Sequence, residues 1–231
     1  MNTLVRNQLL CVDSVGWALI EAHEWDEQAR TIFSHWRTHQ LPLVVCRQGA
    51  ETPPDIVCMG LPSPQQWSRR RMALTVSPEH LTAHADFPSL AQVVQANQWG
   101  AAAIELSDAI ARLDVNAHVY GSHGWQWLTG LAYLHEASDL DLSLTVNSWD
   151  MASQLVQRLA NTSIHCRVDG EIVFPQGKAV AWRELYQLIQ GKTSQVLMKD
   201  RHSLKLLTLK ELIHLCSEAS AQSSKIEGYL P

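Results

Sequence analysis

The sequence predicts an α/β (α+β) protein in two parts, a small N-terminal α/β module over residues 1–97 and a second domain over residues 98–231. Two observations support this. The chain of 231 residues is long enough to bury one large core or two small ones. Helical and strand-like patterns alternate along it, as they do in proteins where helices cover a sheet.

The composition indicates a folded cytoplasmic protein. Hydrophobic residues make up 46% and charged residues 18%, which is ordinary for a globular chain. The net charge of −5 disfavours binding to nucleic-acid phosphates. Neither an apolar run near ~20 residues nor a signal peptide is visible, so we expect no membrane association. The five cysteines are scattered without a CxxC pair, which favours reduced thiols over a zinc site.

The N-terminal module begins with a helical pattern over Ile20–Arg37, where apolar residues share one broad face. Short strand patterns follow at 43–46, Ile56–Met59 and Met72–Val76. Proline and glycine between these segments mark the turns.

The second domain shows longer patterns. Strands are predicted at Ala117–Tyr120, Leu140–Val146 and within Ile164–Phe174. Helices are predicted at Ala101–Leu113, Trp125–Leu134, Ser148–Leu159 with Ser148 as N-cap, Ala179–Leu188 and Leu209–Ala219.

Asp139 and Asp141 are the first candidate site residues. Alternate side chains of a strand point to the same face, so the two carboxylates project together while Leu140 and Leu142 face the core. Two adjacent carboxylates repel each other unless a cation lies between them. Hard oxygen ligands select Mg²⁺ or Mn²⁺, and a pair of such ions can stabilise in-line displacement at phosphorus.

A loop before the acid pair has the features of a phosphate cradle. A strand that ends in Gly121-Ser122 and turns into a helix offers backbone N–H groups and the positive end of the helix dipole. Gly121 allows close approach of the backbone, Ser122 adds a hydroxyl donor, and Gly124 keeps the turn open. A lone D-x-D is usually a solvated pair and a lone Gly-Ser a turn, but together they favour phosphoryl or nucleotidyl transfer.

Gly-Ser followed by D-x-D resembles the polymerase-β-like nucleotidyltransferase superfamily. More narrowly, the stretch VYGSHGWQWLTGLAYLHEASDLDL over 119–142 resembles the phosphoribosyl-dephospho-CoA transferases of malonate decarboxylase. The likeness continues through RVDGEIVF at 167–174 and AVAWRE at 179–184. Sixteen residues separate Ser122 from Asp139, more than in minimal nucleotidyltransferases, as the narrower family allows.

The resemblance implies a nucleotidyltransferase-like mixed sheet flanked by helices and a specific reaction. The enzyme would transfer 2'-(5''-phosphoribosyl)-3'-dephospho-CoA from 2'-(5''-triphosphoribosyl)-3'-dephospho-CoA to a serine of the decarboxylase's acyl-carrier subunit, releasing pyrophosphate. Asp139 and Asp141 would hold Mg²⁺ or Mn²⁺, and Gly121 and Ser122 would bind the triphosphate. A nucleotidyltransferase for another protein, tRNA or small-molecule hydroxyl is the alternative, and a non-catalytic nucleotide-binding protein is a third reading.

The superfamily often uses a third acid on a neighbouring strand, and Asp169 and Glu171 are both candidates. Asp169 is the first choice as a catalytic residue. Asp169-Gly170 is also a good hairpin turn, which would make Asp169 structural.

Several further residues are candidates for binding the donor phosphates. His123 lies in the loop, and Arg183 and Lys199 follow in the C-terminal part. The simpler interpretations are an exposed loop histidine and salt bridges with Glu184 or Asp200.

Two more features are candidates for ligand or partner contacts. The run Arg69-Arg70-Arg71 would meet the donor phosphates or an acidic carrier protein, unless it is a solvated face. Trp125 or Trp127, beside the loop, would stack on the adenine base unless both are core residues.

Overall fold

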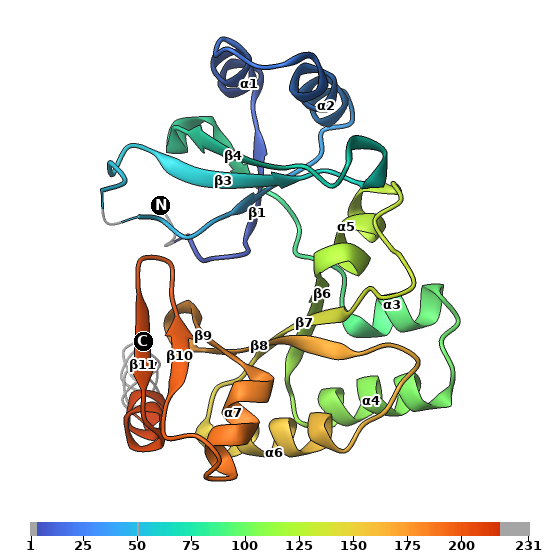
Figure 1. The fold of residues 1–231 in the computed structure, drawn as a ribbon, viewed down its shortest axis with the longest axis vertical. Coiled ribbons are helices and arrows are strands. Elements are labelled where there is room, and N and C mark those ends of the chain that lie inside the picture. The colour runs from blue at the N-terminus through green and yellow to red at the C-terminus, as the bar shows by residue number, and fades with distance from the viewer. Residues whose placement is uncertain (1–3, 50, 218–231) are drawn as a thin grey trace, which may run out of the picture. The chain divides into compact units, whose positions relative to one another are not determined.

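The computed structural model describes residues 4–49 and 51–217, and the chain divides into two compact units (Figure 1). Of the described residues, the first unit contains 4–49, 51–87, 125–134 and 201–203. The second contains residues 88–124, 135–200 and 204–217. Each unit combines a sheet with helices, so the predicted α+β class is confirmed.

The first unit is built on a five-stranded antiparallel sheet in the order β4-β3-β2-β1-β5. Its strands are β1 (Leu9–Val12), β2 (Leu43–Val45), β3 (Val57–Pro62), β4 (Arg71–Val76) and β5 (Leu81–Ala83). The helices α1 (Ser14–Glu21) and α2 (Glu27–Thr38) cover one face of this sheet (Figure 1). Their buried Trp17, Phe33 and Trp36 belong to the same core as Met59 and Leu74 of the sheet.

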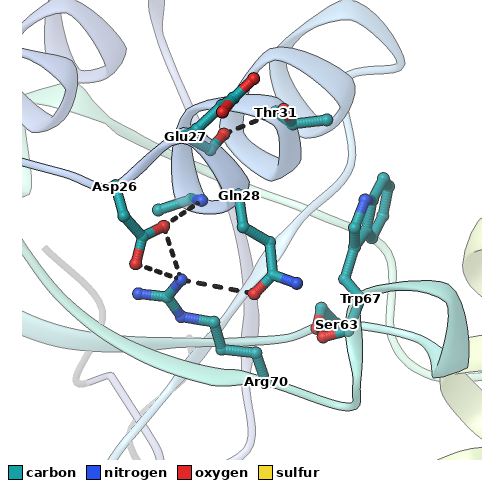
Figure 2. Close-up of polar contacts among 8 residues, drawn as sticks. Asp26, Glu27, Gln28, Thr31, Ser63, Trp67 and Arg70 are labelled. Atoms are coloured by element: carbon teal, nitrogen blue, oxygen red, sulfur yellow. Dashed lines mark hydrogen bonds and ion pairs between the residues drawn. The ribbon is translucent and has the colours of Figure 1, made fainter.

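The single helix predicted over Ile20–Arg37 is wrong, because the chain forms two helices here. Residues 22–26 leave the helical path, and Asp26 begins α2 by accepting a hydrogen bond from the N–H of Ala29 at 2.8 Å. Arg70 Nη1 lies 2.7 Å from both oxygens of Asp26. Figure 2 shows these two contacts as dashed lines. Aspartate is favoured as the N-cap of a helix and disfavoured inside one. Asp26 therefore begins a new helix where a single helix had been predicted.

The second unit is built on a six-stranded sheet in the order β11-β10-β9-β8-β7-β6. The strands are β6 (Asn116–Tyr120), β7 (Leu140–Thr145), β8 (Val168–Phe174), β9 (Lys178–Ala181), β10 (Val196–Lys199) and β11 (Leu204–Leu207). Only the pairing of β7 with β8 is parallel among the described strand pairs of this sheet, so the sheet is mixed. Leu140, Leu142 and Leu144 of β7 are fully buried and alternate with polar side chains, as predicted.

Helices flank this sheet: α3 (Leu90–Ala96), α4 (Ala101–Arg112), α6 (Trp149–Ala160) and α7 (Trp182–Ile189). The helix α5 (Gly121–Thr129) begins in this unit directly after β6, and its residues from Trp125 onward belong to the first unit. Ser148 caps α6 as predicted, accepting from the N–H of Met151 at 3.2 Å. Residues 209–217 are helical, and the last two residues of the helix predicted there lie outside the described part of the chain. No described helix is both long enough and apolar enough to cross a bilayer.

Two predicted helices have different bounds. The helix expected over Trp125–Leu134 begins at Gly121, directly after β6, and ends at Thr129. The helix expected over Ala179–Leu188 is divided, because residues up to Ala181 form β9 and α7 begins at Trp182. β9 pairs with β8 and β10, so long-range pairing overrides the helix propensity of its alanines.

Asp26 provides a test of the first unit. Asp26→Ala removes both the helix cap and the contact with Arg70, whereas Arg70→Ala removes the contact alone. Exposed ion pairs contribute little and caps contribute more, so we expect Asp26→Ala to lower the thermal unfolding midpoint further than Arg70→Ala does. Asp26→Asn keeps a capping oxygen and should resemble Arg70→Ala. Equal midpoints for Asp26→Ala and Asp26→Asn would contradict the capping role.

Candidate active site

Three carboxylates lie near one another where β7 and β8, two inner strands of the second unit's sheet, begin. In the strand register Asp141 lies between Tyr120 of β6 and Asp169 of β8. Asp139 precedes Asp141 by two positions, so its side chain projects to the same side. Antiparallel pairing on one side of β7 and parallel pairing on the other therefore bring together residues that are distant in the chain, from Tyr120 to Asp169.

The environment of Asp141 is unfavourable for a negative charge. Its pKa is raised to about 6, first by burial and then by the charges of Asp169 and Asp139. Arg167 acts in the opposite direction. A cation beside this carboxylate would offset both the burial and the repulsion from its acidic neighbours.

Arg167 is the basic side chain that contacts this cluster. Its Nη2 atom lies 3.0 Å from Asp169 Oδ2, and its Nε atom lies 3.8 Å from Asp139 Oδ2. Arg167 was not among the site residues predicted from the sequence. The available signal was its position two residues before Asp169, which directs both side chains to the same side of the strand.

Gly121 lies directly against Asp141. It adopts a left-handed backbone conformation, with φ of +59°, between the end of β6 and the first turn of α5. A Cβ atom at this position would overlap the Asp141 carboxylate. The predicted phosphate loop and the predicted acid pair are therefore in contact, and only glycine fits between them.

Ser122 and His123 are half-buried in the first turn of α5, and Gly124 is buried. The first N–H groups of a helix lack partners within it, so this turn together with the Ser122 hydroxyl is suited to an anion. Burial, and to a smaller extent His165, lowers the pKa of His123. Its ring contacts Trp99 at 5.4 Å between centroids, and Trp99 also contacts His165 at 4.6 Å.

Of the two candidates for a third acid, Asp169 lies with the acid pair. Asp169-Gly170 is not a hairpin turn, because both residues lie inside β8. A Cβ atom on Gly170 would overlap the backbone of Leu142, so the glycine permits close pairing of β8 with β7. Glu171 is 6% exposed and lies 3.0 Å from the Nζ atom of Lys199. Lys199 therefore pairs with Glu171, not with the Asp200 carboxylate considered from the sequence.

Arg183 lies on the first turn of α7. Its guanidinium is 4.4 Å above the Trp182 ring, and its Nη2 atom donates to the carbonyl oxygen of Val168 at 2.7 Å. The carboxylate of Glu184 accepts from the N–H of Leu197 at 3.3 Å. Arg183 is thus held by an aromatic ring and a backbone carbonyl, and not by a salt bridge with its neighbour.

The remaining predicted contacts lie in the first unit. Arg69 donates to the carbonyl oxygen of Tyr133 at 3.0 Å, Arg70 pairs with Asp26, and the side chain of Arg71 is exposed. Trp125 is only 5% exposed, whereas Trp127 is 43% exposed. Two of the three arginines and Trp125 therefore have structural contacts.

The acid pair fits a divalent cation by its chemistry. Asp139 and Asp141 supply hard oxygen donors, and the crowded negative charge at Asp141 is what a cation would neutralise. Within residues 4–49 and 51–217, no three His, Cys, Asp or Glu side chains already converge as a complete metal site. Arg167, whose Nε atom is 3.8 Å from Asp139 Oδ2, would compete with a cation for this carboxylate.

Comparison with known proteins identifies the family. A family model described as "Phosphoribosyl-dephospho-CoA transferase MdcG C-terminal domain" matches residues 86–210, and one for the N-terminal domain of the same protein matches residues 5–87. The chain belongs to the phosphoribosyl-dephospho-CoA transferase family. Family membership confirms that the protein is a transferase enzyme, as the sequence predicted.

Curated relatives carry the same name over most of the chain. A phosphoribosyl-dephospho-CoA transferase of Bradyrhizobium diazoefficiens is 32% identical over 206 residues, covering 85% of this chain and 90% of that protein. One from Xanthomonas campestris pv. campestris is 32% identical over 177 residues, covering 74% and 81%. One from Xanthomonas euvesicatoria pv. vesicatoria is 33% identical over 189 residues, covering 80% and 86%. No solved structure matches the chain.

The contact between Gly121 and Asp141 gives a test of this transferase's site. Gly121→Ala places a methyl group against the carboxylate and also adds left-handed strain of ~1–2 kcal/mol. We expect a lower midpoint in chemical denaturation. Gly100→Ala is the matched control, because a Cβ atom there meets nothing within 4 Å. Equal stability of the two variants would show that Gly121 and Asp141 are not in contact.

Proposed function

We propose that the protein transfers the 2'-(5''-phosphoribosyl)-3'-dephospho-CoA group from 2'-(5''-triphosphoribosyl)-3'-dephospho-CoA to a serine of the acyl-carrier subunit of malonate decarboxylase. Membership of the transferase family and the names of its relatives support the donor. The observation that carries the proposal is the contact of the acid cluster with the Gly121-Ser122 turn, because transfer at a phosphate needs both.

The reaction balances as a single displacement at phosphorus. The serine oxygen of the carrier attacks the phosphate nearest the ribose and forms a new P–O bond. The anhydride bond to the next phosphate breaks, and its electron pair leaves with pyrophosphate. Asp169 lies beside Asp141 in the strand register. It would act as the general base that accepts the proton of the attacking serine hydroxyl. Arg167 would then have to move away from Asp169 Oδ2, from which its Nη2 atom is 3.0 Å distant.

Other residues of the site would bind and orient the donor. The N–H groups of the first turn of α5 and the Ser122 hydroxyl would bind the triphosphate. Asp139 and Asp141 would hold one or two Mg²⁺ or Mn²⁺ ions, which would neutralise charge on the phosphates during transfer. His123, with its lowered pKa, would be a neutral hydrogen-bonding partner at pH 7.

Intact-mass measurement of the carrier subunit tests the transfer. With enzyme, donor and Mg²⁺, the carrier should gain the mass of the prosthetic group. Asp139→Asn and Asp141→Asn should each lower the rate by ~10³-fold or more, because each removes a ligand charge and keeps the side-chain shape. Asp108→Asn, an exposed change on α4, is the control and should keep the rate. An unmodified carrier would contradict the reaction, and full activity of either site variant would contradict the assigned roles.

Thermal unfolding tests the cation site without measuring activity. The raised pKa of Asp141 means that folding favours its protonated form, so this contribution to stability is lost as the pH rises from 3.8 to about 6. In EDTA above pH 6, Asp141→Asn should therefore unfold at a higher temperature than the wild type, and below pH 3.8 at nearly the same temperature. Mg²⁺ should raise the midpoint of the wild type but not of Asp141→Asn.

The reverse results would contradict this assignment. A wild-type midpoint that Mg²⁺ leaves unchanged argues against a cation at the acid pair. A destabilised Asp141→Asn protein in EDTA above pH 6 argues that the carboxylate is already neutralised there. Asp108→Asn again serves as the control, and it should follow the wild type under each condition.

A further inference from the structure

A cavity of about 670 Å³ lies in the second unit, next to the acid cluster. Its walls come from the C-terminal end of α6, the segment that leads into β8, and the first half of α7. This volume is in the range of sites that hold small molecules or nucleotides. The side chains that carry the argument are Ser163, His165, Arg167, Trp182, Arg183 and Tyr186.

Two of these side chains connect the cavity with the site already described. Arg167 lines the cavity and also contacts Asp139 and Asp169. His165 lines it and contacts Trp99, whose ring also contacts His123 in the first turn of α5. Only the Arg167 side chain would therefore separate a ligand in the cavity from Asp139 and Asp169.

The lining suits an aromatic base that carries phosphates. Arg183 is fixed between the Trp182 ring and the carbonyl oxygen of Val168, so its planar group needs little ordering on binding. Guanidinium planes stack on aromatic rings and also bind phosphate oxygens. Tyr186 adds a half-buried ring, and Arg167 adds a second positive charge.

The first turn of α7 also lines the cavity, and this helix has no side-chain cap. Backbone N–H groups at the start of a helix suit acceptor-rich groups such as phosphates.

We propose that this cavity binds the adenine nucleotide of the dephospho-CoA portion of the donor, while the triphosphate lies against α5 and the acid cluster. This inference rests on the proposed function, because that function supplies the donor. The cavity is concave and partly aromatic, and its two arginines outnumber its one carboxylate, that of Glu184, which suits a nucleotide. Arg183 is then a donor-binding residue, and Arg167 lies between the two ends of the donor.

Calorimetric titration with dephospho-CoA, which lacks the triphosphoribosyl group, tests the cavity alone. The full-length protein is titrated in EDTA, so the acid pair holds no cation. We expect binding to the wild type and at least a tenfold weaker affinity in Ser163→Trp, where an exposed side chain is enlarged into the cavity. Arg183→Ala should weaken binding similarly. Gln154→Trp, an exposed change in a different groove between α4 and α6, is the matched control.

Three results would overturn the cavity assignment. The first is an absence of dephospho-CoA binding to the wild type, and the second is unchanged affinity in folded Ser163→Trp, verified by its thermal midpoint. The third is a loss of affinity in Trp127→Ala instead, which would place the base beside α5. Each leaves the proposed function intact if the carrier still gains the prosthetic group. An unmodified carrier together with cavity-dependent binding would instead contradict the transfer and retain the nucleotide site.

Discussion

Parallel pairing of β7 with β8 places Asp141 beside Asp169, and the rest of the site depends on this pairing. Burial first, and then the charges of Asp169 and Asp139, raise the pKa of Asp141 to about 6. The close approach requires Gly170 in β8 and Gly121 above Asp141, since a side chain at either position would overlap its neighbour. Repulsion between these carboxylates destabilises the folded state where β7 and β8 begin, and such local destabilisation is common at functional sites.

Arg167 connects the separate parts of the second unit's site. It partly neutralises Asp139 and Asp169, and it also lines the neighbouring cavity. Under the proposed function, a cation at Asp139 and Asp141 would compete with this arginine, and the released guanidinium would lie between the triphosphate and the nucleotide of the donor. Replacement of Arg167 by a cation at the carboxylates would thus couple cation binding to donor binding without movement of the sheet.

Local patterns predicted the parts of the site that lie close in sequence. Alternation along β7 predicted that Asp139 and Asp141 point together, and the Gly121-Ser122 pair predicted a strand-to-helix turn. The sequence could not decide whether Asp169-Gly170 forms a hairpin, because the parallel partner that makes it a strand lies almost 30 residues earlier. For the same reason it offered no partner for Lys199 on another strand, and it could not reveal a cavity whose walls come from three segments. Apolar spacing alone predicted one helix where the structure has two, because Asp26 caps the start of the second.

The most direct measurement of the central claim is a crystal structure of the protein soaked in Mn²⁺, with the metal located by its anomalous signal. The acid cluster and the phosphate-binding turn should form one cation-dependent centre. The account predicts an anomalous peak within bonding distance, ~2.0–2.2 Å, of oxygens of Asp139 and Asp141, with the Arg167 guanidinium no longer beside Asp139. A peak elsewhere, with Arg167 still bridging Asp139 and Asp169, would contradict it.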